Sequence, residues 1–526
     1  MNDFELGGTL ISLIVALPLL SSALALVLRR HRVWRDLITL STLVVVTAAS
    51  VWLAIEVESG GTIVLLVGDW TPELGIALVA DLFAVLVLPV ALATIALVEI
   101  FAIGQRASST GADPTVADPT LLVLTSGVAL SVLTGDLFTL FVAFELMLVA
   151  SYVLLTHQGR HDQVRSGMTY VVINLFASTL FLFGIAFVYA ATGTVNMALL
   201  VDRIAELDDS VRLGIGVWFL VVFGTKAAMF PLFSWLPDSY PTAPTTITAV
   251  FAGLLTKIGV YVMIRFHVLT GMDDLGGLIL IIAGLTMIVG VAGALAQDDM
   301  KRILSFHIVS QIGYMMMGLG LFTVAGVAGA VLFLVHQIPV KTVLFLTAGL
   351  VEHERGTAAL GRLGGLVSKR PFIAAMFGLA ALSLAGLPPF SGFVAKLALV
   401  DAGIDVSSTV IVVVALVGSA LTLLSMVKIW AGAFWGTDPE PDDHADGGNA
   451  APQPATRRER VGRTTMTAST GAMVALTIAI AVFAGPLFDD STRAADDLLE
   501  GDPYVEAVLG RYELCCADDD EEAGQP

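Results

Sequence analysis

The chain has 526 residues, of which 56% are hydrophobic and only 14% are charged, and its mean hydropathy is +0.87. This composition excludes a soluble enzyme and predicts an all-α polytopic membrane protein, because many apolar runs reach the ~20 residues that a membrane-spanning helix needs. The net charge of −19 argues against nucleic-acid binding. The first residues, MNDFELGG, are acidic and lack a basic region, so we expect no cleaved signal peptide.

We predict about fourteen transmembrane helices. The fourth and fifth are separated only by Gly135 and Asp136. The twelfth is too long for one straight span and contains Gly386, Pro388 and Pro389, so we expect two half-helices there. The predicted spans are 9–28, 37–55, 79–103, 119–134, 136–156, 167–191, 212–235, 245–267, 276–296, 302–321, 324–350, 372–402, 408–432 and 466–487.

These spans group into larger units. Residues 1–118 contain helices one to three, 119–270 a first five-helix repeat (helices four to eight), and 271–432 a second (helices nine to thirteen). Residues 433–465 are rich in Pro, Gly, Asp and Arg and are expected to form a flexible cytoplasmic loop. Helix fourteen, 466–487, precedes an acidic tail, 488–526. The tail contains Cys515 and Cys516, whose adjacency fits neither a zinc site nor a disulfide framework.

Basic residues predict the orientation in the membrane. If the spans alternate, the arginine- and lysine-rich loops after helices one, five, nine, eleven and thirteen all fall on one side, and the opposite side is mainly acidic. Cytoplasmic loops carry the excess of basic residues. We therefore expect a multi-pass protein of the cell membrane with both termini outside.

Two interrupted helices suggest an internal repeat. Lys226 precedes Pro231 in helix seven, whereas Lys396 follows Pro388 and Pro389 in helix twelve. The chain enters these helices from opposite sides of the membrane. Interrupted segments at matching positions of two halves are typical of inverted repeats with a functional site near the midplane.

Seven ionisable residues lie deep in apolar segments: Glu145, Lys226, Lys257, His307, His336, Lys341 and Lys396. A charge at the bilayer centre costs at least ~2.5–3.5 kcal/mol, so such residues usually line an ion pathway. A buried carboxylate and a buried lysine restore each other's charge when they pair, so moving one of them alters the protonation of both. This coupling is suited to proton transfer.

Structural roles are the alternative for several residues. His307 could be a core histidine with satisfied hydrogen bonds, and Lys341 could help to fix a helix end. Lys428 and Arg265 lie near the ends of their spans, where we expect them to extend to the lipid headgroups. Asn174 and Gln311 are expected to hold helices together.

Four stretches resemble the D-type subunit of Mrp-type cation/proton antiporters. They are 141–200, beginning FELMLVASYVLL; 223–265, with FGTKAAMFPLFSWLPDSYPTAPTTITAVFAGLLTKIGVY; 336–349, HQIPVKTVLFLTAG; and 386–399, GLPPFSGFVAKLAL. The wider family includes the proton-pumping antiporter-like subunits of respiratory complex I and membrane hydrogenases. The resemblance implies fourteen helices with inverted repeats formed by helices four to eight and nine to thirteen.

The resemblance also implies roles for the deep ionisable residues. Glu145 matches the glutamate of helix five, Lys226 its lysine partner on broken helix seven, and Lys257 the connecting lysine of helix eight. His307, His336 and Lys341 fall on the central hydrophilic axis, and Lys396 matches the lysine of broken helix twelve. The family often has histidines flanking the WLPD motif, where this chain has Phe233-Ser234 and Ser239-Tyr240.

We therefore predict a proton-translocating subunit of a multisubunit Na⁺ or K⁺/proton antiporter, not an enzyme. The resemblance implies A-, B-, C-, E-, F- and G-type partner subunits in a hetero-oligomeric membrane complex. No phosphate-binding loop or metal-ligand cluster stands out, so we expect no cofactor. One alternative is a proton-pumping subunit of a redox-driven complex I-like or hydrogenase complex, and another is a passive membrane scaffold.

Overall fold

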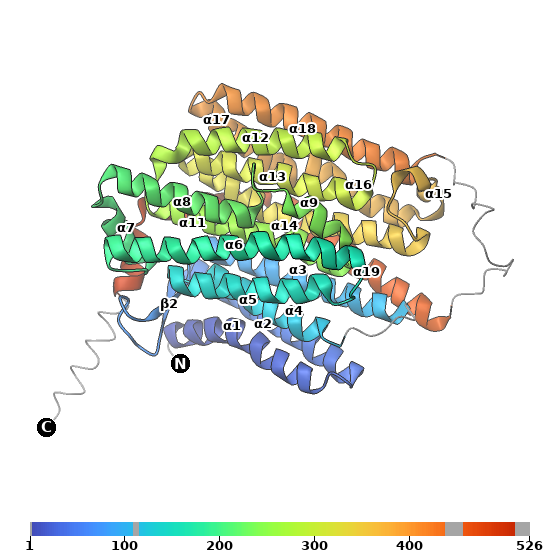
Figure 1. Ribbon diagram of the computed structural model, residues 1–526, viewed down its shortest axis with the longest axis horizontal. Helices are drawn as coiled ribbons and strands as arrows, with labels where there is room; N and C mark the ends of the chain where they lie inside the picture. The colour runs from blue at the N-terminus through green and yellow to red at the C-terminus, as the bar shows by residue number, and fades with distance from the viewer. Residues whose placement is uncertain (1–2, 109–114, 437–455, 511–526) are drawn as a thin grey trace.

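Helices lying side by side along the long axis dominate the computed structural model, which describes residues 3–108, 115–436 and 456–510 (Figure 1). In this part of the chain, twelve helices are long and apolar enough to cross a membrane, and Ala117–Leu133 and Pro371–Ala385 are apolar but shorter. Together they match the fourteen predicted spans, and the predicted all-α polytopic membrane fold is confirmed. Most of the predicted loop and the end of the tail, with Cys515 and Cys516, lie outside the described residues.

The amino-terminal unit contains a β-hairpin that was not predicted. The unit consists of α1 (Asp3–Val27), α2 (Arg32–Gly60), the antiparallel strands β1 (Ile63–Val67) and β2 (Ile76–Ala80), and α3 (Leu82–Ser108). The predicted span 79–103 wrongly includes the end of β2. The third helix begins only after Asp81, whose carboxylate accepts a hydrogen bond from the backbone N–H of Ala84, as expected for a residue that caps a helix.

The two predicted repeats contain the broken helices. The first consists of α4 (Ala117–Leu133), α5 (Leu137–Thr156), α6 (His161–Thr192), α7 (Met197–Ala205), α8 (Asp209–Ala227), α9 (Trp235–Ser239), η1 (Tyr240–Thr242), α10 (Thr245–Val250), the π-helix η2 (Phe251–Leu255) and α11 (Thr256–Leu269). The second consists of η3 (Asp273–Leu275), α12 (Gly276–Leu295), α13 (Met300–Leu321), α14 (Val324–Arg355), η4 (Leu360–Arg362), α15 (Leu366–Lys369), α16 (Pro371–Ala385), α17 (Ser391–Asp405), α18 (Thr409–Ile429) and η5 (Trp430–Phe434).

A matching backbone bridge supports the inverted relation of the repeats. Asp136 caps α5 and pairs with Asn196, and Asp299 caps α13 and pairs with Ala359, each through an isolated antiparallel bridge. The first bridge directly precedes α7, and the second lies shortly before α15. These two elements lie at opposite ends of the bundle (Figure 1). The same local structure is thus repeated upside down.

Both predicted helix interruptions are present. The helix α8 ends at Ala227 and is followed by Ala228 in the left-handed conformation (φ 62°), whereas α16 ends at Ala385 and is followed by Gly386 (φ 84°). Each interruption leaves carbonyl groups at the end of a half-helix without their usual partners. The carbonyls at the end of α16 accept hydrogen bonds from Lys396 in the site described below.

The last transmembrane helix is longer than predicted. The helix α19 (Arg457–Val482) begins nine residues before the predicted start at 466, because Thr456 and Glu459 form a capping box. Residues 457–465 therefore belong to a helix and not to a loop. The predicted tail also begins as a helix, α20 (Ala484–Glu500), which packs against α14 and α3.

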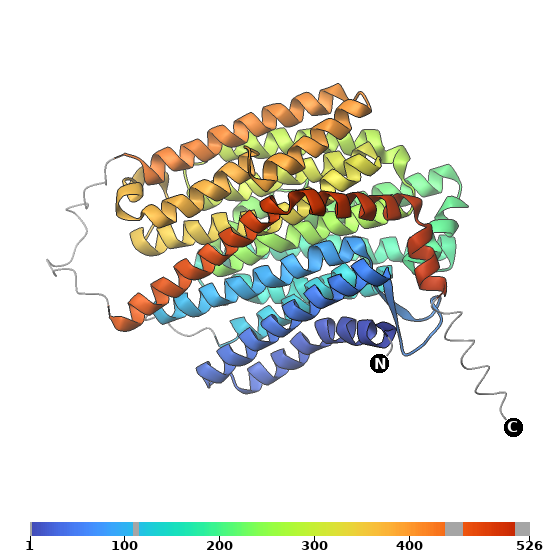
Figure 2. The same cartoon turned by 180° about the vertical axis from the view of Figure 1, so that it is seen from behind.

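The segments Thr245–Leu269 and Val324–Arg355 form the centre of the bundle, and the most apolar stretch of each is completely buried. The start of α1 and the end of α20 lie at the same end of the molecule (Figure 2), as an even number of spans requires. The α1–α2 turn, α15 and the start of α19 lie at the other end, which we call the arginine-rich face.

Candidate functional site

The seven predicted site residues are distributed over both repeats. Glu145 lies on α5, Lys226 in the last turn of α8, and Lys257 on α11; the others are His307 on α13, His336 and Lys341 on α14, and Lys396 on α17. We call these seven residues the midplane chain. All are buried except Glu145, which is half-buried.

Lys226 and Glu145 are not in contact. The Lys226 ammonium donates to Ser178 Oγ (2.9 Å) and to the backbone oxygen of Asn174 (3.2 Å), and it lies 5.7 Å from the centroid of the Phe144 ring. Among the described residues Glu145 forms no ion pair, and its Oε1 is buried without a hydrogen-bond partner. The predicted pair is therefore open, although the two charges still interact electrostatically.

Lys257 is held by a π-helical turn of its own helix. Its ammonium donates to the backbone oxygen of Ala252 (2.5 Å), five residues earlier, within the π-helix η2. π-helical turns are rare and occur frequently at functional sites. No local pattern indicates this turn, since the segment reads as an ordinary apolar helix.

The second repeat surrounds its histidines with serines. His307 Nε2 lies 2.8 Å from Ser425 Oγ of α18, and His336 Nδ1 lies 2.8 Å from Ser391 Oγ of α17. The second ring nitrogen of each histidine is buried without a partner among the described residues. His307 is therefore not the fully hydrogen-bonded core histidine of the structural alternative.

Lys396 occupies the break in helix twelve. Its ammonium donates to the backbone oxygens of Leu384 (3.1 Å) and Ala385 (3.3 Å), at the end of α16, and lies 4.6 Å from the centroid of the Tyr314 ring. The negative end of a helix attracts a cation, so the interruption creates the binding place for this lysine.

Lys341 lies close enough to lysines of both repeats for their charges to repel one another. Its ammonium is buried without a hydrogen-bond partner in the described part of the protein, and it interacts electrostatically with Lys257 and Lys396. Both histidines interact with Lys341 and Lys396 as well. The alternative role for Lys341, fixing a helix end, is wrong, because α14 continues to Arg355.

Two other basic residues differ from expectation. Arg265 does not extend to the headgroups; it is 2% exposed and forms a two-pronged ion pair with Asp81 at 2.7 and 2.8 Å. Lys428 donates to the backbone oxygens of Leu295 and Gln297 and pairs with Asp298 at the end of α12. Both side chains therefore bond to partners within the protein and not to lipid headgroups.

Comparisons with known proteins identify the fold. Residues 134–422 match the family described as NADH:quinone oxidoreductase/Mrp antiporter, TM. The D-type subunit of the Na⁺/H⁺ antiporter of Alkalihalophilus pseudofirmus is 42% identical over 95% of this chain and 99% of its own length, and that of Bacillus subtilis is 34% identical over 97% and 100%. The chain belongs to this family.

Two solved structures share the fold of this family member. The Mrp complex from Dietzia contains a chain with a TM-score of 0.86 and 34% identity, covering 97% of this chain and all of that one. A chain of the membrane-bound sulfane sulfur reductase, an archaeal respiratory membrane complex, has a TM-score of 0.82 and 26% identity, with 95% and 99% covered. The same architecture thus occurs in an antiporter complex and in a respiratory complex.

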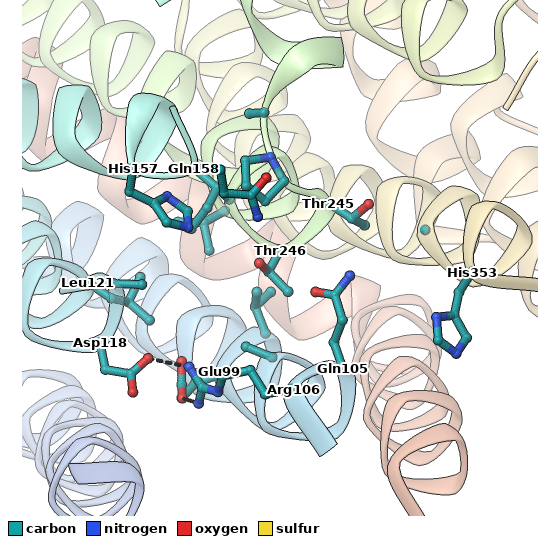
Figure 3. Close-up of a pocket in the computed structure, with 18 of the residues that line it drawn as sticks. Glu99, Gln105, Arg106, Asp118, Leu121, His157, Gln158, Thr245, Thr246 and His353 are labelled. Carbon is teal, nitrogen blue, oxygen red and sulfur yellow. Dashed lines mark hydrogen bonds and ion pairs between the residues drawn. The ribbon is translucent and has the colours of Figure 1, made fainter. Parts of the chain in front are cut away.

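A polar cavity opens at the arginine-rich face, partly outside the family match. It has a volume of ≈ 940 Å³ and lies between the ends of α3, α5 and α14 and the start of α10 (Figure 3). On one wall, Arg106 bonds to both Glu99 and Asp118, and Asp118 also pairs with Arg35. This ionic cluster ties α2, α3 and α4 together. Glu99 lies within a predicted apolar span but was not among the predicted site residues.

The opposite wall of the cavity joins the two repeats. Glu352, near the end of α14, pairs with Lys301 of α13 and accepts a hydrogen bond from Thr245 at the start of α10 (3.2 Å). The helix α10 leads directly into η2 and to Lys257. The cavity thus reaches a helical segment that carries part of the midplane chain.

Substitution of Gly392 tests how tightly α17 packs near His336. A Cβ atom there would lie 1.9 Å from the backbone oxygen of Ser383 and 2.9 Å from His336 Nε2. We therefore expect Gly392→Ala to displace α17 from α16 and to abolish transport, measured as cation-dependent proton movement in vesicles. Gly277→Ala is the matched control, because Gly277 is also the second residue of a helix and a Cβ there meets nothing within 4 Å. Wild-type transport by Gly392→Ala would contradict this account of the helix break.

Proposed function

We propose that this chain is the proton-translocating subunit of a multisubunit Na⁺ or K⁺/proton antiporter. It is a transporter subunit rather than an enzyme, and it works in a hetero-oligomeric membrane complex with A-, B-, C-, E-, F- and G-type subunits. The full-length similarity to proteins named as D-type subunits of Na⁺/H⁺ antiporters supports this assignment. The basic residues at the arginine-rich face favour a cell-membrane orientation with both termini outside.

The observation that carries the proposal is the open Glu145–Lys226 pair. Lys226 is held by neutral acceptors while the carboxylate of Glu145 stays unpaired. A lysine that exchanges between neutral partners and a carboxylate changes the proton affinity of both groups. Closing and opening of this pair therefore couples protonation in the first repeat to charge movement along the chain.

The remaining residues extend this coupling across the molecule. In the proposed sequence, a proton enters the first repeat and Lys257 passes the charge perturbation through Lys341 to the two histidines. Lys396 then gates release in the second repeat. The repeats 119–270 and 271–432 are the units of this mechanism, and each supplies one lysine at a helix break.

Glu145→Ala tests the pair. We expect it to abolish exchange of protons for Na⁺ or K⁺, because Lys226 loses the carboxylate with which it alternates. Acridine orange fluorescence in inverted vesicles measures the exchange, and blue native electrophoresis measures assembly. Glu73→Ala removes an exposed carboxylate and should exchange normally. Normal exchange by an assembled Glu145→Ala complex would rule out the mechanism.

The second candidate is a proton-pumping subunit of a redox-driven complex. The similarity to a chain of an archaeal respiratory membrane complex favours it. In that case proton movement depends on electron transfer and not on an imposed Na⁺ or K⁺ gradient. Exchange in vesicles without any redox substrate therefore distinguishes the two functions.

A further inference from the structure

An aromatic cluster near Lys226 contains tyrosines that the mechanism above does not use. Tyr170 of α6 packs against Tyr152 of α5 and Trp235 of α9, with ring centroids 5.6 and 5.3 Å apart, where α5 and α6 lie side by side (Figure 1). Tyr240 of η1 also packs against Trp235, at 5.9 Å. Tyr170 and Tyr240 are buried. A buried phenol usually has a hydrogen-bond partner, so the partners of these hydroxyl groups indicate what the cluster can do.

Tyr170 and Ser151 form a hydrogen bond that can run in either direction. Their hydroxyl oxygens lie 2.8 Å apart, and Ser151 Oγ also lies 2.7 Å from the backbone oxygen of Leu148. When Ser151 donates to Leu148, Tyr170 donates to Ser151. When Ser151 donates to Tyr170, the phenol proton is free for another acceptor. A hydroxyl group accepts and donates at the same time, so this pair can relay a proton without ionising.

A small cavity connects Tyr170 with Lys226. Its volume is ≈ 20 Å³, and both residues line it together with Asn174 and apolar side chains. A polar cavity larger than ~10–15 Å³ can hold one water molecule if two to four polar partners are present. Tyr170, Asn174 and Lys226 are such partners. The cavity is therefore suited to one water molecule between the phenol and the lysine.

Tyr240 extends this route towards the arginine-rich face. Its hydroxyl is buried without a hydrogen-bond partner among the described residues, and it interacts electrostatically with Tyr170. An unpaired buried hydroxyl costs ~1–3 kcal/mol, so Tyr240 gains from any hydrogen bond that a relay supplies. Thr242, at the end of the same 3-10 helix, lines the ≈ 940 Å³ cavity. Tyr240 thus lies two residues from the wall of that cavity.

We propose that Tyr170 and Ser151 relay protons between Lys226 and the cavity at the arginine-rich face. The inference rests on the proposed function and adds the residues that carry protons to the open pair. A proton that reaches the phenol oxygen of Tyr170 through the cavity water leaves as the phenol proton towards Tyr240, or moves in reverse. Each oxygen regains one hydrogen. Ser151 resets the direction of the Tyr170 hydroxyl by switching its own donation between Tyr170 and Leu148.

Tyr170→Phe keeps the ring and removes only the hydroxyl. In inverted vesicles with the complete complex, we expect it to slow Na⁺- or K⁺-driven proton movement about 100-fold at saturating cation, the low end of what a positioned proton-transfer group contributes. The cation concentration for half-maximal exchange should stay unchanged, because the relay carries protons and does not bind the cation. Ser151→Ala should also slow exchange, whereas Ser151→Thr keeps the hydroxyl and should retain most of it.

Two controls remove hydroxyl groups that are not part of the relay. Tyr152→Phe alters the same aromatic cluster, but the Tyr152 hydroxyl contacts a backbone oxygen, that of Val171, at 3.4 Å. Ser131→Ala removes another buried serine hydroxyl, which donates to the backbone oxygen of Gly127. Both variants should exchange like the wild type, and the temperature at which the purified complex dissociates should be the same for Tyr170→Phe and Tyr152→Phe.

The outcomes separate the relay from the proposed function. Normal exchange by Tyr170→Phe, an equal loss in Tyr152→Phe, an equal loss in Ser151→Ala and Ser131→Ala, or a higher cation concentration for half-maximal exchange would overturn the relay. In each of these cases the wild-type complex still exchanges Na⁺ or K⁺ for protons. A wild-type complex without such exchange would contradict the proposed function itself.

Discussion

Lys226→Ala is expected to reduce Na⁺- or K⁺-dependent proton movement to the level of vesicles that lack the complex. Lys226 is the cationic half of the open pair, and its ammonium donates hydrogen bonds to Asn174 and Ser178. In the proposed mechanism alanine removes the cation that alternates between Ser178 and Glu145, so opening and closing of the pair can no longer move charge. Helix α8 ends at the next residue, so alanine itself is tolerated there.

The measurement uses inverted vesicles from a strain without its own antiporters that expresses the complete complex. Assembly is checked in the same membranes, because a transport defect is informative only if the subunit is present. Lys369→Ala removes an exposed lysine at the arginine-rich face and should leave exchange unchanged. Unchanged exchange in Lys226→Ala would make the buried lysine structural and favour a scaffold.

Arg265→Gln is expected to destabilise the protein by about 3–5 kcal/mol, which is typical when one partner of a buried ion pair is removed. The guanidinium contacts the Phe83, Tyr261 and Tyr504 rings in addition to Asp81. It therefore joins α11 to the start of α3 and to the carboxyl-terminal residues. Without it, the Asp81 carboxylate stays buried with no counter-charge.

A double-mutant cycle separates the pair from general damage. Asp81→Asn combined with Arg265→Gln should cost less than the sum of the single changes, because neither residue is left as an isolated charge. The control is Arg212→Gln, which breaks an exposed pair with Asp274 of the same 2.7 Å length and should cost ~0–1 kcal/mol. The readout is the temperature at which the purified complex dissociates. Equal shifts for Arg265→Gln and Arg212→Gln would show that burial of the pair is unimportant.

Hydropathy determined the architecture, because the requirement for satisfied backbone groups in lipid leaves a long apolar segment few alternatives to a helix. Glu145, Lys226, Lys257 and Lys396 were recognisable for a different reason. A charged side chain within a membrane-spanning apolar segment is costly and usually marks a functional site. The proline-rich interruptions at Pro231 and Pro388 were also readable, because proline cannot continue the hydrogen-bonded ladder. Each of these features depends only on residues that are close together in the sequence.

Contacts between distant segments were decided only by the tertiary structure. No pattern near Arg265 indicates Asp81, and none near Lys226 indicates that Ser178 would replace Glu145 as its partner. The hairpin β1–β2 consists of two short strands, and the start of α19 depends on one capping box. Both sequence patterns are weak in a chain dominated by long apolar segments. The serine partners of His307 and His336 come from α18 and α17. Sequence spacing identifies which residues are buried and charged, but the three-dimensional packing of separate helices selects their partners.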